Sequence, residues 1–198
     1  MSPATPSASC KEEHMKKVQL PLTEETIRGL KAGDQVLLSG TVLTGRDAAH
    51  KRLLALMDQG QELPINLAGQ TIYYVGPAPA RPGQAVGPAG PTSSYRMDKY
   101  TPPLLDLGLK GMIGKGRIGP ETLKVMPAHG AVYFGAIGGS AVIISKSIKS
   151  ARVVAYPDLG PEAIHEFVIE DFPAVVCVDA QGNNLYEEGP KLYKQDEL

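Results

Sequence analysis

The sequence predicts an α/β protein built on a mainly parallel sheet. Two observations predict this fold class. Short apolar runs typical of strands alternate with segments of helical spacing, which is the pattern of a parallel sheet covered by helices. The stretch 165–188 instead contains strand-like runs around a Gly-Asn turn, which adds an antiparallel element. The chain has 198 residues, 42% of them apolar, which is enough for one domain with a sizeable core.

The first part of the chain predicts a helix, a strand and a second helix. In the segment 22–34, Thr23 is placed to cap a helix whose first turn carries two glutamates. The apolar run 35–43 predicts a strand. The segment 46–60 has the apolar spacing of a helix that stops at Gly60.

The rest of the chain continues this alternation and then departs from it. A strand at 71–77 is followed by a Gly/Pro-rich passage, and so long a loop in a compact domain is either functional or disordered. Later segments predict a short helix and strand in 104–114, a helix at 119–130 with Pro120 in its first position, and a strand, a helix and a strand between 131 and 159. The segments HEFVIED (165–171) and AVVCVDAQGNNLYEE (174–188) are expected to be antiparallel strands.

Composition excludes several classes of protein. The formal net charge is −1, which argues against a general surface for nucleic acid or for an anionic membrane. No apolar run approaches the length of a membrane-spanning helix. The first residues lack the apolar core of a secretory signal and the arginines of a transit peptide. We therefore expect a soluble, cytoplasmic protein, with 1–14 as a disordered extension and 15–198 as a single catalytic domain.

The chain contains two cysteines, Cys10 and Cys177. Cys177 lies in an apolar run and is expected in the core. Two cysteines form no disulfide framework, and this usage is typical of a reducing compartment. Iron–sulfur clusters are usually held by three or four thiolates, so we expect this chain to hold neither a cluster nor another metal by itself.

A polar loop, TGRDAAH at 44–50, joins a predicted strand to the helix after it. Arg46 and Asp47 are therefore expected at the carboxyl edge of the parallel sheet, where ligands usually bind. A helix N-terminus favours an anion, and the arginine fork matches a carboxylate. His50 lies one turn into the helix, where it could act as an acid, a base or a hydrogen-bond donor. The alternative is that Asp47 caps the helix, Arg46 is a surface charge and His50 is packed.

A glycine-rich loop, GMIGKGRIG at 111–119, lies between a predicted strand and a predicted helix. Gly114, Gly116 and Gly119 form a G-x-G-x-x-G pattern in the position of a dinucleotide-binding loop. The acidic residue expected about twenty positions later is missing. The sequence therefore favours a loop that holds Lys115 near a small anion, with a nucleotide-binding module or a simple tight turn as alternatives.

The stretch GPTSSYRMD at 90–98 combines hydroxyl groups with a cation. Thr92 and the two serines after it can cap a helix that begins there. Arg96 would then lie on the same helix face as Thr92 by i, i+4 spacing, so that a hydroxyl and a guanidinium face a carboxylate together. The alternative is a capped helix with a surface arginine. Together, the three loops predict a site for a small anionic substrate.

Four motifs in order give the chain a family resemblance: SGTVLTGRDAAHKRL, GPAGPTSSYRMD, GMIGKGRIGPE and SIKSARVVAYPDLGPEAIHEF. From about Lys16 to Tyr186 the chain resembles the β subunit of two-subunit class I fumarate hydratases and L(+)-tartrate dehydratases, or the C-terminal domain of one-chain members. The first motif is more similar to the fumarase branch, since tartrate dehydratases tend to have cysteines in it. The resemblance implies a swivelling β/β/α domain with a central mainly parallel sheet, an additional antiparallel sheet and helices on one side.

The resemblance also implies an activity and a partner. The reaction would be reversible hydration of fumarate to L-malate, a small dicarboxylate. A [4Fe-4S] cluster held by three cysteines of a partner α subunit would act as the Lewis acid. The two subunits would form an α2β2 assembly. A homodimer of the isolated chain is a further alternative. A non-catalytic scaffold that only binds a partner remains an alternative.

Site residues follow from the resemblance position by position. Arg46 and Arg96 would bind the substrate carboxylates, with Lys115 beside them. Thr92 matches a residue proposed to remove the C3 proton. That proton is next to a carboxylate, so its removal builds charge on a negative group and requires fixed cations.

Two further catalytic candidates, Asp47 and His50, match the RDxxH part of the first motif. The chain departs from its relatives nearby, because GPTS stands where relatives often have GPTT, and SSY precedes Arg96 where small residues are common. This departure concerns the local geometry from Ser93 to Tyr95.

Overall fold

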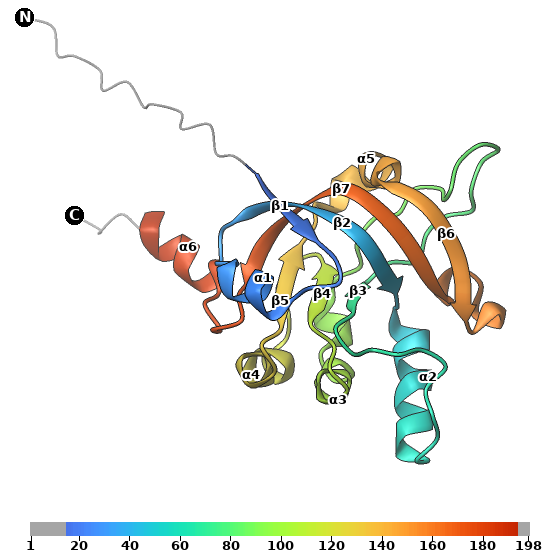
Figure 1. Ribbon diagram of the computed structural model, residues 1–198, viewed down its shortest axis with the longest axis horizontal. Coiled ribbons are helices and arrows are strands. Elements are labelled where there is room, and N and C mark those ends of the chain that lie inside the picture. The colour runs from blue at the N-terminus through green and yellow to red at the C-terminus, as the bar shows by residue number, and fades with distance from the viewer. Residues whose placement is uncertain (1–14, 194–198) are drawn as a thin grey trace, which may run out of the picture.

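A computed structural model describes residues 15–193 and shows one mixed sheet of seven strands with helices around it (Figure 1). The expected extension at 1–14 lies outside the described residues. The strands lie in the order β1-β2-β3-β4-β5-β7-β6, and β1 to β5 are parallel neighbours. Their bounds are Lys16–Gln19 (β1), Gln35–Thr44 (β2), Thr71–Tyr73 (β3), Gly111–Gly114 (β4), Val132–Gly135 (β5), Ile148–Ala155 (β6) and Ile164–Val178 (β7).

The antiparallel strands belong to this same sheet and do not form the separate second sheet that was expected. Strand β7 pairs antiparallel with β5 and with β6, and it also pairs along most of β2. Pairing therefore runs from β2 through β3, β4, β5 and β7 back to β2, so these five strands close into a ring. A closed ring leaves no free edge among its members.

Strand β7 also corrects the expectation of two separate strands on either side of residues 172–173. Asp171 and Pro173, on either side of Phe172, are residues of the kind that favours a turn. The structure instead bends one continuous strand: Asp171 adopts a positive φ of 48°, and its N–H donates to Ser39 Oγ at 3.0 Å. The pairing with β2 shifts register at this point, so the bend acts as a bulge in a continuous strand.

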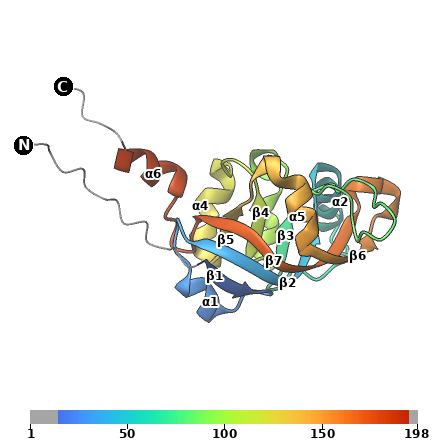
Figure 2. The ribbon, with the colours of Figure 1, turned by 90° about the horizontal axis from the view of Figure 1, so that it is seen from above.

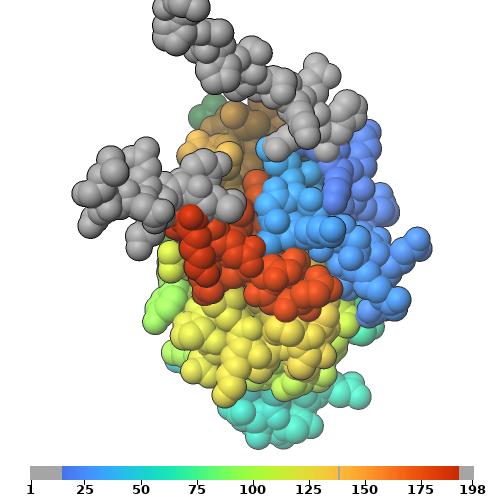
Figure 3. Space-filling view, turned by 90° about the vertical axis from the view of Figure 1, so that its left-hand side faces the viewer, coloured from blue at the N-terminus to red at the C-terminus, as the bar shows by residue number. Residues whose placement is uncertain are grey.

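The segment Leu185–Tyr193 is helical, whereas a strand was expected as far as residue 188. The Gly-Asn turn is present, with Gly182 at φ 88° and the Asp179 carboxylate accepting from the Asn183 N–H at 3.0 Å. The next residue, Asn184, accepts from the Tyr186 N–H at 3.0 Å and donates to Glu187 Oε1 at 3.2 Å. The Asn184 side chain thus caps the N-terminus of a helix. Figure 3 shows this helix, α6 (Leu185–Tyr193), on the surface between the regions of α1 (Glu24–Gly29) and α4 (Pro120–His129).

The helices lie on both sides of the strands, and not on one side as expected. Figures 1 and 2 show α2, α3 and α4 together on one side, with α5 against β7 on the other. The prediction that Thr23 caps the first helix is confirmed, because its Oγ1 accepts from the Thr26 N–H at 3.1 Å. The bounds are Glu24–Gly29 (α1), Asp47–Asp58 (α2), Thr101–Asp106 (α3), Pro120–His129 (α4), Ala141–Ser147 (α5) and Leu185–Tyr193 (α6), with 3₁₀ turns at Ser94–Met97 (η1), Gly138–Ser140 (η2) and Pro157–Glu162 (η3).

Two apolar cores result from this arrangement. One fills the inside of the strand ring and includes Phe134 and Phe172. The other lies between the outer face of the strands and α2 to α4, and includes Leu53 and Met126. Burial of each such side chain stabilises the fold by roughly 1.5–3 kcal/mol. Because one core lies on each side of the strands, the loops that join strands to helices are held in place. Within residues 15–193, no helix is both long and apolar enough to cross a bilayer.

Candidate active site

The segment around Thr92 is wedged between the ends of two parallel strands. Just past β3, the Tyr74 N–H still donates to the Ile113 carbonyl of β4 at 2.8 Å. The strands then separate, because the Thr92 N–H donates to the Tyr74 carbonyl at 2.6 Å and the Lys115 N–H donates to the Thr92 carbonyl at 3.1 Å. Thr92 and Lys115, distant in sequence, are thereby neighbours at the carboxyl edge of the sheet.

Buried hydroxyl groups hold the Thr92 segment in this position. Ser94 is fully buried, and its Oγ lies 2.8 Å from the Tyr133 hydroxyl, which also donates to the Gly116 carbonyl at 2.7 Å. A side chain at Gly114 would place its Cβ 2.0 Å from Ser94 Oγ. The first glycine of the loop therefore makes room for the anchor of the Thr92 segment.

The expected helix at GPTSSYRMD is shorter than predicted and begins later. It is the single 3₁₀ turn η1, its N-cap is Ser93, and no side chain caps it. Thr92 lies before this turn in extended backbone that bonds to its neighbours as a strand. The prediction that Thr92 and Arg96 share a helix face is therefore wrong, because strand pairing with Lys115 holds Thr92 out of the helix.

Arg96 is instead held by a residue of α2. Its Nε donates to Asp47 Oδ1 at 3.0 Å and one Nη donates to Asp47 Oδ2 at 2.8 Å, a parallel fork of the kind that orients a guanidinium firmly. Arg46 lies beside this pair, with its Nε 3.6 Å from Asp47 Oδ2. Asp47 does not cap α2, since the N-cap position belongs to Arg46 and Asp47 is the first helical residue.

His50 is fully buried on the inner face of α2. Its Nδ1 lies 2.8 Å from the Arg46 carbonyl oxygen, which only accepts, so Nδ1 carries the proton. Burial lowers the pKa of His50 to about 4, against the opposing effects of this hydrogen bond and of the Asp47 charge. His50 is therefore neutral near pH 7. Its Nε2 is buried without a hydrogen-bond partner among the described residues, and its ring lies edge-on to Tyr74.

Lys115 and Thr92 complete the set of predicted residues. The Lys115 side chain is exposed and Thr92 is half-buried. Neither ammonium nor hydroxyl has a hydrogen bond to another residue in the part of the chain that the structure describes. Four of the six candidates, Arg46, Asp47, His50 and Arg96, are joined by hydrogen bonds and ion pairs at the start of α2. Thr92 and Lys115 are joined to each other by a backbone hydrogen bond, and the short stretch from Thr92 to Arg96 links the two sets.

The glycine loop has structural roles that leave little room for a nucleotide. A Cβ at Gly119 would lie 2.1 Å from the Asp98 carboxyl carbon. That carboxylate accepts from the Thr122 N–H at 2.8 Å and from the Glu121 N–H at 3.2 Å. The N-terminus of α4, where a dinucleotide-binding loop would hold a pyrophosphate, is therefore already filled by Asp98. This arrangement disfavours the nucleotide-binding alternative.

Two residues that contact the site gave no signal in the sequence. Asp98 accepts from N–H groups of α4 that lie 23 and 24 residues away, and Glu162 accepts from the Ala48 N–H at the start of α2 from 114 residues away. Both contacts form only in the folded chain, because neither carboxylate belongs to the N-cap residue of the helix that it binds. Side chains of this kind can be found only once the fold is known.

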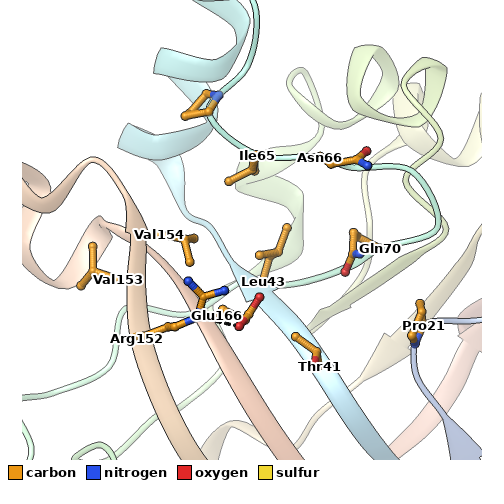
Figure 4. A pocket seen from close by; sticks show the side chains of 11 residues that line it. Pro21, Thr41, Leu43, Ile65, Asn66, Gln70, Arg152, Val153, Val154 and Glu166 are labelled. Atoms are coloured by element: carbon orange, nitrogen blue, oxygen red, sulfur yellow. Dashed lines mark hydrogen bonds and ion pairs between the residues drawn. The ribbon is translucent and has the colours of Figure 1, made fainter.

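Two cavities bear on the location of the site. One of about 490 Å³ is lined by Asp47, Tyr95, Arg96, Asp98, Lys99 and Tyr100, and so contains two of the predicted residues. A cavity of about 630 Å³ lies elsewhere and contains none of them (Figure 4). In that cavity, Arg152 and Glu166 point toward each other and pair at 2.8 Å. The two charged residues of this second cavity are thus paired with each other. The first cavity is the better candidate site, because Asp47 and Arg96 line it.

Comparison with known proteins places these features in a family. The family model described as "Fumarase C-terminus" matches residues 2–189. "Fumarate hydratase class I, aerobic" of Escherichia coli is 42% identical over 153 residues, 76% of this chain and 28% of that protein. "Putative fumarate hydratase class I" of Geobacillus stearothermophilus is 38% identical over 182 residues, 89% of this chain and 34% of that protein.

A third relative has nearly the same length as this chain. "Putative L(+)-tartrate dehydratase subunit beta" of Methanocaldococcus jannaschii is 34% identical over 181 residues, which cover 88% of this chain and 93% of that protein. Against the two fumarate hydratases, in contrast, the chain spans about a third of their length. The resemblance stated from the motifs is confirmed, and the chain belongs to the fumarase C-terminus family, together with class I fumarate hydratases and a relative named as a tartrate dehydratase β subunit.

Proposed function

We propose that this chain is the β-type half of a hydro-lyase that interconverts fumarate and L-malate. The observation that carries the proposal is the connection of Arg46, Arg96, Thr92 and Lys115, from three separate loops, at one edge of the sheet. Relatives named as class I fumarate hydratases support the reaction class. In this proposal the chain supplies substrate-binding and proton-transfer groups, and an α-type partner completes the site.

The cations of the site suit a dicarboxylate. Each guanidinium offers a planar fork that matches one carboxylate. Asp47 orients Arg96 by using its Nε and one Nη, which leaves the other Nη for a substrate oxygen. Lys115, exposed at the end of β4, adds a compact charge beside Thr92. These groups would hold the substrate and stabilise the charge that grows on its carboxylate when the C3 proton leaves.

Thr92 is the proposed proton-transfer group. An alcohol ionises far above neutral pH, so its hydroxyl requires a strongly electropositive site or acts as a relay. The backbone of Thr92 is fixed by bonds to Tyr74 and Lys115, which would keep the hydroxyl in one place. His50, buried and neutral, would support Arg46 through its carbonyl and would not itself exchange a proton.

The described residues do not fit an iron–sulfur cluster. Residues 15–193 contain no group of three or more His, Cys, Asp or Glu side chains placed to hold a metal ion, and Cys177 is a single buried thiol. We therefore propose that the [4Fe-4S] cluster implied by the family belongs to the partner, in an α2β2 assembly. The steps assigned to this chain are binding and orienting the dicarboxylate and moving its proton.

A tartrate dehydratase is the second candidate, because the relative that this chain covers almost completely is named as a β subunit of that enzyme. The two functions are separated by assaying one anaerobically prepared complex with the α-type partner on fumarate and on L(+)-tartrate. We expect kcat/KM for fumarate to exceed that for tartrate by at least about tenfold, the discrimination that the net free energy of one hydrogen bond provides. A preference for tartrate would overturn the assignment of substrate and keep the hydro-lyase class.

A further inference from the structure

A carboxylate from the other end of the chain holds the start of α2. Glu162, at the end of η3, accepts from the Ala48 N–H at 2.9 Å through Oε2. Its other oxygen, Oε1, lies 3.5 Å from an Nη of Arg46. We propose that Glu162 is a positioning residue for Arg46, which fixes the direction of the guanidinium at the edge of the candidate site.

Glu162 reaches two groups that a helix N-terminus presents together. The first N–H groups of α2 have no partner within the helix and carry positive potential, so a carboxylate is stabilising there. By binding both Ala48 and the side chain of the N-cap residue, one rigid carboxylate ties the guanidinium to the helix axis. The side chains of Glu162 and Arg46 are both largely shielded, 28% and 24% exposed.

The aliphatic part of the Arg46 side chain passes through a narrow space beside Gly76. A Cβ at Gly76 would lie 3.1 Å from Arg46 Cδ and 3.1 Å from the Pro161 carbonyl oxygen. Gly76 therefore lets the Arg46 stem pass close to the segment that carries Glu162. Arg46 Nε is buried without a hydrogen bond among the described residues, and its ion-pair contact there is Asp47 Oδ2 at 3.6 Å, an oxygen that already accepts from Arg96. Glu162 instead contacts an Nη of Arg46 through an oxygen that has no other partner among the described residues, so this contact can set the direction of the guanidinium.

The segment Pro157–Glu162 makes a second contact with α2, before its kink at Gly160 (φ 56°, ψ −120°), and this contact serves as a control. Asp158 receives a forked pair of hydrogen bonds from Arg52, at 2.8 Å and 2.5 Å. This pair joins η3 to α2 as the Glu162 contact does, but it lies away from Arg46. Loss of the Asp158 contact therefore reports the general effect of loosening η3, and loss of the Glu162 contact reports the effect on Arg46.

The first test needs no enzyme activity. In the isolated chain, ¹⁵N relaxation of the Arg46 Nε–H group is compared among wild type, Glu162→Gln and Asp158→Asn. Glutamine keeps an oxygen for the Ala48 N–H but places an uncharged amide against Arg46. We expect an order parameter of about 0.8 in wild type and Asp158→Asn, and below about 0.6 in Glu162→Gln. An Arg46 group equally ordered in all three proteins would overturn the proposal.

The second test rests on the proposed function and uses the complex with the α-type partner. Glu162→Gln should lower kcat/KM for fumarate by on the order of ten- to a hundredfold, as expected for a misplaced binding group, whereas Asp158→Asn should leave it unchanged. In an Arg46→Lys background, Glu162→Gln should cause little further loss, because it acts through Arg46. Full additivity of the two losses would contradict the role. An inactive wild-type complex would refute the proposed function, and the relaxation test would still decide on Glu162.

Discussion

Arg96 and Asp47 form a forked ion pair, with Nε to Oδ1 at 3.0 Å and Nη to Oδ2 at 2.8 Å, that joins η1 to the first residue of α2. Together with Arg46 and Glu162, the pair places two cations and two carboxylates at one edge of the sheet. In the proposed function, the guanidinium groups are thus oriented before the substrate arrives, which would reduce the entropy lost on binding. Lys115 has no ion-pair partner among the described residues and leaves a positive charge unmatched at this edge.

Replacing Arg96 by lysine should damage activity far more than stability. Lysine lacks the fork that matches a carboxylate, and a charged hydrogen bond is worth about 1.5–3 kcal/mol, so kcat/KM for fumarate should fall about ten- to a hundredfold. The free energy of unfolding should change by less than about 1 kcal/mol, because this pair is partly exposed. Steady-state kinetics of the complex and urea denaturation of the chain measure the two effects.

Arg52→Lys is the matched control. Arg52 lies on α2, as Asp47 does, and makes a similar forked pair with Asp158 of η3, but it lies outside the candidate site. Its kcat/KM should equal that of the wild type. If Arg96→Lys behaves like Arg52→Lys, the stretch 90–98 is only a helical turn with a surface arginine.

Thr92→Ala should reduce kcat with a smaller change in KM. A group that moves a proton contributes mainly in the transition state, whereas the arginines also hold the ground state. The loss should be about a hundred- to ten-thousandfold, the range of general acid–base catalysis. Isotope exchange of the C3 proton of L-malate into water measures the step itself. Exchange at the wild-type rate in Thr92→Ala would show that another group removes the proton.

The buried His50 should make the fold less stable at mildly acidic pH. Burial holds its pKa near 4 in the folded chain, below the ordinary value of 6.5. Between these values the unfolded chain binds a proton that the folded chain does not, so stability is complete above pH 6.5 and is lost as the pH falls toward 4. The loss between pH 7.5 and pH 5 should be about 2 kcal/mol from this residue.

His50→Asn isolates that contribution, because the asparagine amide can still donate to the Arg46 carbonyl. Urea denaturation at pH 7.5 and pH 5 should show a smaller drop in the variant than in the wild type. His165, whose pKa is also lowered by burial, adds to the drop in both proteins and cancels in the comparison. Equal drops would mean that His50 is protonated in the folded chain.

Local patterns predicted the parts of this structure that are held by local forces. The cap at Thr23, the junction of β2 with α2, and Pro120 at the start of α4 each follow from a few adjacent residues. The positions of Arg46 and Lys115, just after the ends of β2 and β4, could also be predicted, because parallel strands bring their carboxyl ends to one edge.

The remaining features depend on partners distant in the sequence. Asp171 and Pro173 have the local signature of a turn, yet pairing with β2 on one side carries β7 through them as a single strand. Thr92 has a cap-like sequence around it, but bonds to Tyr74 and Lys115 outweigh that preference. Asp98 and Glu162 bind N–H groups at helix N-termini that lie 23 and 114 residues away, so no pattern near them could reveal their roles.

The most direct test of the account is complementation between the two halves of the proposed enzyme. This chain and its α-type partner are purified separately under anaerobic conditions, and fumarate hydration is followed for each alone and for the mixture. The account predicts no hydration by this chain alone, rapid hydration by the mixture, and a loss of about ten- to a hundredfold when the mixture contains Arg46→Lys. Hydration by this chain alone, or a mixture as active with Arg46→Lys as with wild type, would contradict it.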